Sequence, residues 1–165
     1  MKCPNSECGG ILIESRADWH YRECGLSNVI LRGMPVLHCL TCEHRNVVFS
    51  ESEFAYKDIS RELLLLPRTL LADEMRFLQE EMRLRDSELS FKMKRSLKEV
   101  RRWLSWKSAL DPISDLRVRL LGAERIFCEP EAGRMKDAVL RMFRTEYQDK
   151  SSYHRMIFIQ CGNKK

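Results

Sequence analysis

Short apolar runs separated by turn residues fill the first fifty positions of the chain. Gly25, Gly33 and Pro35 interrupt these runs. Alternating strand-like runs of this length, broken by glycine and proline, are typical of a small strand-rich module. The runs are Ile11–Ile13, Trp19–Tyr21, Val29–Leu31, Val36–His38 and Val47–Phe49. We therefore expect a β-rich unit over residues 1–50.

Beyond residue 51 the apolar positions follow a helical period. A helix is expected from Ser52 to Leu66, where Pro67 stops it, so residues 51–68 form a connector. Next, one apolar stripe recurs at i, i+4, i+7 and i+11, with Thr69 as its expected N-cap. That stripe comprises Leu71, Met75, Leu78 and Met82.

Four further helices and a strand are expected in the rest of the chain. Short helices are predicted at Asp86–Met93 and Leu97–Trp106, and Pro112 opens another that contains Leu116, Leu120 and Leu121. The last forty residues predict a helix over Arg134–Tyr147 and a strand over Tyr153–Gln160.

Charge is distributed unevenly along the 165 residues, which include 29 basic and 24 acidic side chains. Residues 1–60 have a net charge of −2, whereas residues 61–110 have +4 and residues 111–165 have +3. The densest run, Lys92–Lys107, holds seven basic residues and one acidic residue. Such a patch is suited to phosphate, although a solvated helix face is the alternative interpretation.

Cysteine spacing predicts a metal site. Cys3 and Cys8 form one close pair, and Cys39 and Cys42 form another. Two such turn-borne pairs supply four thiolates at tetrahedral corners, so we expect them to bind one Zn²⁺. A closed four-cysteine shell leaves no position for water or substrate, which makes the zinc structural. The remaining cysteines, Cys24, Cys128 and Cys161, are interpreted as packed bystanders.

The expected helix from Leu97 is amphipathic. Leu97, Val100 and Leu104 share its apolar face, with Trp103 at the edge. The opposite face holds Lys98, Arg101, Arg102 and Ser105. A short helix, a tight turn and a second helix with a basic outer face make a helix-turn-helix candidate for double-stranded DNA.

The order of these motifs resembles that of MqsA-type antitoxins, in which a YgiT-type zinc finger precedes an Xre-like helix-turn-helix. The resemblance covers about the first 125 residues. It rests on Cys3-Pro4, Cys8, Gly25, Gly33–Val36, Cys39 and Cys42, then on Glu74–Ser90, Ser96, Val100, Arg102-Trp103 and Pro112–Ser114.

The resemblance implies a homodimeric repressor of its own operon that neutralises a toxin protein through the zinc module. The helical domain would supply the dimer contacts. Base-reading positions would fall on Lys98 and Arg102, with Glu99 and Arg101 beside them. The predicted DNA-binding set is completed by the turn residues Lys94, Arg95 and Ser96.

The sequence thus predicts an α+β protein with four regions. Residues 1–50 are a zinc-binding module, residues 51–68 a connector, and residues 69–125 an all-α helix-turn-helix domain. Residues 126–165 form a short α/β C-terminal extension of unknown role. No apolar run spans a bilayer and the first residues lack a signal-peptide core, so a soluble cytoplasmic protein without a membrane partner is expected.

The favoured function is that of a sequence-specific transcriptional repressor, the antitoxin of a toxin–antitoxin pair. Two alternatives stay open. One is a stand-alone transcription factor without a toxin. The other is a protein-interaction module with a degenerate DNA-binding domain, motivated by Asp86, Lys94 and Arg95, which depart from the family pattern. No enzyme is expected, because the chain lacks a catalytic triad pattern, a phosphate-binding glycine loop and a His-Glu-x-x-His motif.

Overall fold

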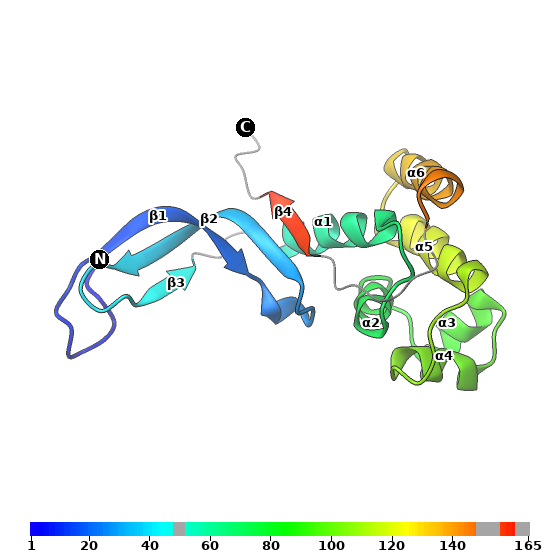
Figure 1. The fold of residues 1–165 in the computed structure, drawn as a ribbon, viewed down its shortest axis with the longest axis horizontal. Helices are drawn as coiled ribbons and strands as arrows, with labels where there is room; N and C mark the ends of the chain where they lie inside the picture. Colours follow the sequence, from blue (N-terminus) through cyan, green and yellow to red (C-terminus); the bar gives the residue numbers. More distant parts are fainter. Residues whose placement is uncertain (48–51, 148–155, 161–165) are drawn as a thin grey trace.

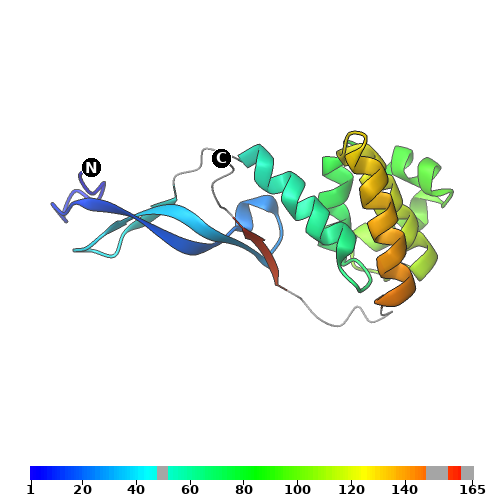
Figure 2. The same ribbon diagram turned by 90° about the horizontal axis from the view of Figure 1, so that it is seen from above.

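A computed structural model describes residues 1–47, 52–147 and 156–160 and shows the mixed α+β fold that the sequence predicts. A long twisted sheet extends from one end of a helical body (Figures 1 and 2). None of the helices in the described ranges is long and apolar enough to cross a membrane. In chain order the elements are β1 (Leu12–His20), a 3₁₀ turn (Arg22–Cys24), β2 (Val29–Cys39), β3 (Arg45–Val47), α1 (Ser52–Leu65), α2 (Ala72–Glu81), α3 (Asp86–Met93), α4 (Leu97–Leu104), α5 (Pro112–Ile126), α6 (Glu131–Thr145) and β4 (Ile157–Gln160).

Strand β2 is the centre of the sheet. It pairs with β1 in antiparallel register along nearly its whole length, from Leu12–Cys39 to His20–Ile30. On its other edge, β3 pairs antiparallel with residues 36–38 and β4 pairs parallel with residues 29–32. The C-terminal strand therefore belongs to the same sheet as the predicted zinc module.

The prediction of separate short strands is wrong in β2, which runs through Gly33 and Pro35 without a break. Between the pairs Ala17–Met34 and Trp19–Leu31 the strand holds one extra residue, a β-bulge. Gly33 has a φ of 68° there, its carbonyl accepts a hydrogen bond from Arg16 Nη1 (2.9 Å), and its N–H donates to Asp18 Oδ1 (3.3 Å). Two side chains of β1 thus form hydrogen bonds with the backbone of Gly33 at the bulge. The glycine bends β2 at this point and does not end the strand.

The local helix signals place α1, α3 and α5 correctly: α1 ends before Pro67, α3 spans Asp86–Met93 and α5 begins at Pro112. The expected cap of α2 is wrong. Leu71 occupies the N-cap position, and its N–H donates to Glu74 Oε2 (2.9 Å). Thr69 instead places its hydroxyl 2.9 Å from that of Tyr147, because the chain between α1 and α2 is held by tertiary contacts.

Three other boundaries differ from those expected. Helix α4 ends at Leu104, two residues early, and Trp106 beyond it has a φ of 60°. Helix α6 begins at Glu131 after Pro130, three residues before the expected start, and ends at Thr145. Strand β4 is described from Ile157, whereas the expected start at residue 153 lies outside the described residues, as does residue 161.

Aromatic packing and one buried hydrogen bond attach the sheet to the helical body. Tyr21, after β1, packs edge-on against Tyr56 of α1 with ring centroids 6.1 Å apart. Tyr56 stacks on Phe77 of α2 at 5.8 Å. Asn28 Nδ2, just before β2, donates to Glu74 Oε1 (3.3 Å). One end of the sheet is therefore docked, and the other end extends away from the helices (Figure 2).

A buried arginine stabilises the centre of the helical body. The guanidinium of Arg119, on α5, has no exposed surface and pairs with the equally buried Asp115 at 3.2 Å. Its Nη1 donates to the carbonyls of Leu63 (2.9 Å), Leu64 (3.0 Å) and Leu66 (2.9 Å). The last carbonyls of a helix have no partner within that helix, so Arg119 caps the C-terminus of α1 from another element.

Candidate metal centre and candidate nucleic-acid interface

The four predicted cysteine ligands meet at the free end of the sheet. Their Sγ atoms all lie within 4.8 Å of one another, with Cys3–Cys42 and Cys8–Cys39 both at 3.5 Å. Zinc–sulfur bonds of about 2.3 Å in a tetrahedron place the sulfurs about 3.8 Å apart. The cluster therefore has the donor set and the size for one tetrahedral metal ion.

Strand pairing brings the two loops together. The first loop precedes β1, and Cys39 is the last residue of β2, directly opposite Leu12. Within each loop a hydrogen bond shapes the turn: Cys3 N–H donates to Gly10 O (2.9 Å), and Cys39 N–H donates to His44 O (2.8 Å). The sheet thus positions four ligands that are far apart in the sequence.

Backbone amides and neighbouring thiols alter the acidity of the ligands. The N–H groups of Thr41 and Cys42 point at Cys39 Sγ and lower the pKa of this thiol to about 6. A hydrogen bond with Cys42 is the main reason that the pKa of Cys8 is raised to about 12. Loss of hydration raises the pKa of Cys3. Cys39 is therefore more readily available to a metal as a thiolate than Cys3 or Cys8, whose protons must leave as the metal binds.

Gly10 is a site residue that the sequence analysis missed. A Cβ atom at this position would lie 2.7 Å from Cys39 Sγ and 3.1 Å from Cys8 Sγ. The first distance is shorter than real Cβ contacts and the second is tighter than most, so a side chain at this position would force the two sulfurs to shift. Its place directly after the first cysteine pair, in Cys8-Gly9-Gly10, is the signal that could have identified it.

Gly10→Ala should weaken metal binding while the helical body stays folded, because the added methyl group displaces Cys8 and Cys39. We expect a loss in zinc affinity of about tenfold or more, as for disturbed ligand positions in other metal sites. Competition with a chromophoric zinc chelator measures this. Gly133→Ala in α6 is the matched control and should leave the affinity unchanged. Equal affinities for both variants would contradict the role of Gly10.

At the opposite end of the molecule, α3 and α4 are joined by the turn 94–96. Lys94 ends α3 with a left-handed φ of 51°. Ser96 caps α4: its Oγ accepts a hydrogen bond from the Glu99 N–H (3.2 Å), and its own N–H donates to Glu99 Oε2 (3.0 Å). The Ser96 hydroxyl also donates to Glu99 Oε2 (2.8 Å), and this bond, together with that from the Ser96 N–H, lowers the pKa of Glu99. Two of the residues predicted to bind DNA, Ser96 and Glu99, thus form a capping box that defines where α4 begins.

The two faces of α4 are those that the sequence pattern predicts. Val100, Trp103 and Leu104 are buried against the helical body. The exposed face holds Lys98, Arg101, Arg102 and Ser105. The helix therefore exposes a row of basic side chains. It lies at the end of the molecule remote from the N-terminus and β3 (Figure 1).

Ion pairs divide the predicted basic residues into two groups. Arg101 Nε lies 3.3 Å from Asp86 Oδ2. Arg95 is half-buried and pairs with Asp111 (3.2 Å) and Glu99 (3.8 Å). Within the described ranges, the remaining three basic residues make no ion pair with a carboxylate: Lys94, Lys98 and Arg102.

Asp86, at the start of α3, also has a structural role. Besides Arg101, it accepts a hydrogen bond from Gln79 Nε2 (2.9 Å), so one carboxylate connects α2, α3 and α4. Its negative charge is compensated locally by the guanidinium of Arg101.

Comparison with known proteins assigns no family to the chain. No family model matches it, and neither a curated protein nor a solved structure matches it significantly. The resemblance to MqsA-type antitoxins therefore stays a prediction. The metal centre and the basic helix are inferred from the residues and the geometry of this chain alone.

Proposed function

We propose that the protein is a sequence-specific transcriptional repressor that inserts α4 into the major groove of double-stranded DNA. The observation that carries this proposal is the exposed basic face of α4, with Lys98 and Arg102 one helical turn apart and free of ion pairs within the described residues. A short helix and a three-residue turn precede it, as in helix-turn-helix proteins.

Each basic residue then has a defined task. Arg102 has the planar fork that pairs with guanine, and Lys98 reaches a base edge or phosphate from the preceding turn of the helix. Lys94 in the α3–α4 turn is placed for a backbone phosphate. Arg101 is oriented by Asp86, which holds its guanidinium at the same end of the helix pair. A homodimer would place two such helices about 34 Å apart on the DNA.

The test is an electrophoretic mobility shift on the DNA upstream of the protein's own gene. Lys98→Ala/Arg102→Ala should lower the affinity by about 100-fold, because each base or phosphate contact contributes about 1–3 kcal/mol. The wild-type affinity should fall steeply as salt rises. Arg125→Ala, an exposed arginine on α5, is the control and should bind normally. Failure of the wild type to shift this DNA at moderate salt would rule out the proposal.

A structural Zn²⁺ fits the proposal for the other end. Cys3, Cys8, Cys39 and Cys42 would hold it, and the ion would supply a rigid link between the two loops. All four protein ligands are thiolates, which suits a closed structural site. The expectation that the protein is not an enzyme stays a prediction, which a metal-dependent activity lost in folded Cys42→Ser protein would overturn.

We further propose that this end of the sheet binds a toxin protein. Apolar side chains around the cysteines support it: Ile11 is 65% exposed and Leu40, between Cys39 and Cys42, is 73% exposed. Exposed apolar patches of this kind mark protein interaction sites. Co-purification with the product of the neighbouring reading frame tests this, and Leu40→Asp should abolish it. DNA binding without any such partner would instead favour a stand-alone transcription factor.

A protein-interaction module without a DNA role is the second candidate. It is favoured by the ion pairs of Arg95 and Arg101, which hold two of the predicted DNA-binding cations in contacts within the chain. Partner binding that persists when no operator is bound would support it, and tight operator binding would eliminate it.

A further inference from the structure

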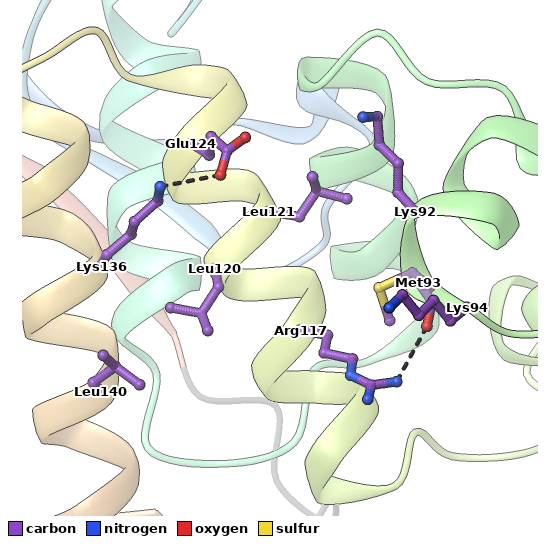
Figure 3. Close-up of a pocket in the computed structure, with 9 residues that line it drawn as sticks. All are labelled: Lys92, Met93, Lys94, Arg117, Leu120, Leu121, Glu124, Lys136 and Leu140. Carbon is purple, nitrogen blue, oxygen red and sulfur yellow. Dashed lines mark hydrogen bonds and ion pairs between the residues drawn. The ribbon is translucent and has the colours of Figure 1, made fainter.

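A groove with an unusual mixture of side chains lies between the end of α3 and the helices α5 and α6 (Figure 3). Its volume is about 490 Å³. The apolar part of the lining consists of Met93, Leu120, Leu121 and Leu140, and the charged part consists of Lys92, Lys94, Arg117, Lys136 and Glu124. Figure 3 shows the leucines between the helices and the cations around them.

The charges in this groove are unbalanced. Glu124 is the one carboxylate of the lining, and Lys136 pairs with it at 3.0 Å. Lys92, Lys94 and Arg117 form no ion pair with any carboxylate of the described ranges. Arg117 Nη1 is held in place by the carbonyl of Met93 at 3.3 Å. Three uncompensated cations therefore surround an accessible apolar surface.

We propose that this groove binds a small amphipathic anion, of the class of medium-chain carboxylates. The apolar body of such a molecule would contact Leu120, Leu121 and Leu140. Its carboxylate would meet Lys94 and Arg117, because Arg117 is bonded to the carbonyl of Met93, the residue next to Lys94. Charge complementarity favours an anion, because a neutral ligand leaves the cations uncompensated. The volume lies in the range of small-molecule sites, which is the reason for choosing a small molecule over a protein segment.

The position of the groove suggests what the ligand would do. Lys94 lies in the groove and also begins the turn to α4, and Met93 is the last residue of α3. A ligand bound here would bridge the end of α3 to α5 and α6. Binding itself does not depend on the proposed function, whereas an effect of the ligand on operator affinity does.

Titration of the full chain with decanoate, followed by ¹³C-methyl NMR, tests the inference. We expect saturable shifts for the methyl groups of Leu120, Leu121 and Leu140. Decanol, with the same chain and no charge, and acetate, with the charge and no chain, should each bind at least about tenfold more weakly, since each lacks one half of the contacts.

Paired variants locate the anion. Lys94→Gln should weaken decanoate binding by about fivefold, because one of the two charged partners of the carboxylate is lost. Arg134→Gln, an exposed residue of α6 outside the lining, is the matched control and should bind as the wild type does. The inference is overturned if decanoate causes no saturable shift, if decanol binds equally well, or if the two variants behave alike. None of these results depends on DNA binding, so they leave the operator experiment independent.

Discussion

Cys42→Ser protein should purify without metal and with the free end of its sheet unfolded. Three thiolates remain, and the serine hydroxyl is a poor zinc ligand. Mutation of a residue that only supports a ligand costs about 10–100-fold in metal affinity. Loss of a ligand itself should therefore lower the zinc affinity by more than about 100-fold. Because zinc binding contributes to the folding of such small modules, the loops and the adjoining part of β1 and β2 should lose their order. Helices α2 to α5 should persist, since they lie at the other end of the molecule (Figure 1).

Elemental analysis measures the metal content, and amide hydrogen exchange reports order residue by residue. Cys128→Ser is the matched control, because Cys128 is exposed and lies outside the cysteine cluster. It should keep one metal ion per chain. Acidification should release the ion from the wild type, because protons compete for the thiolates. Retention of a full metal ion by Cys42→Ser would contradict the four-cysteine site.

Arg119→Met should destabilise the whole helical body by about 3–5 kcal/mol, the usual cost of removing one partner of a buried ion pair. The change leaves Asp115 buried without its guanidinium and leaves the carbonyls of Leu63, Leu64 and Leu66 without this donor. For a chain of this size that corresponds to a fall in Tm of about 10 °C.

Thermal and urea unfolding, followed by circular dichroism, measure this loss. Arg125→Met, on the exposed side of the same helix, should change the free energy of unfolding by less than about 0.5 kcal/mol. Arg119→Met/Asp115→Leu should be more stable than Arg119→Met alone, because no unpaired buried charge remains. A loss of stability no larger than that of Arg125→Met would show that the buried pair is not the stabilising element.

The parts of the site that the sequence predicts well depend on residues close together in the chain. The two cysteine pairs, the polar and apolar faces of α4, the start of α5 at Pro112 and the limits of α3 all follow from local spacing and helix signals. The parts that it predicts poorly involve residues whose partners lie elsewhere. Thr69 has a good capping side chain, but contact with Tyr147 and the carboxylate of Glu74 determine the start of α2.

By itself, the sequence determined the α+β class, the cysteine quartet and the basic helix, because each depends on composition or on a period of a few residues. Only the tertiary structure decided that β2 is one bent strand, that β4 returns to pair with it, and that Gly10 lies behind the sulfurs. It also decided that Asp86 and Asp111 pair with Arg101 and Arg95, whereas Lys98 and Arg102 stay unpaired among the described residues. The physical reason is that a side chain's charge and shape are local properties, whereas the partner that it meets depends on how distant segments pack.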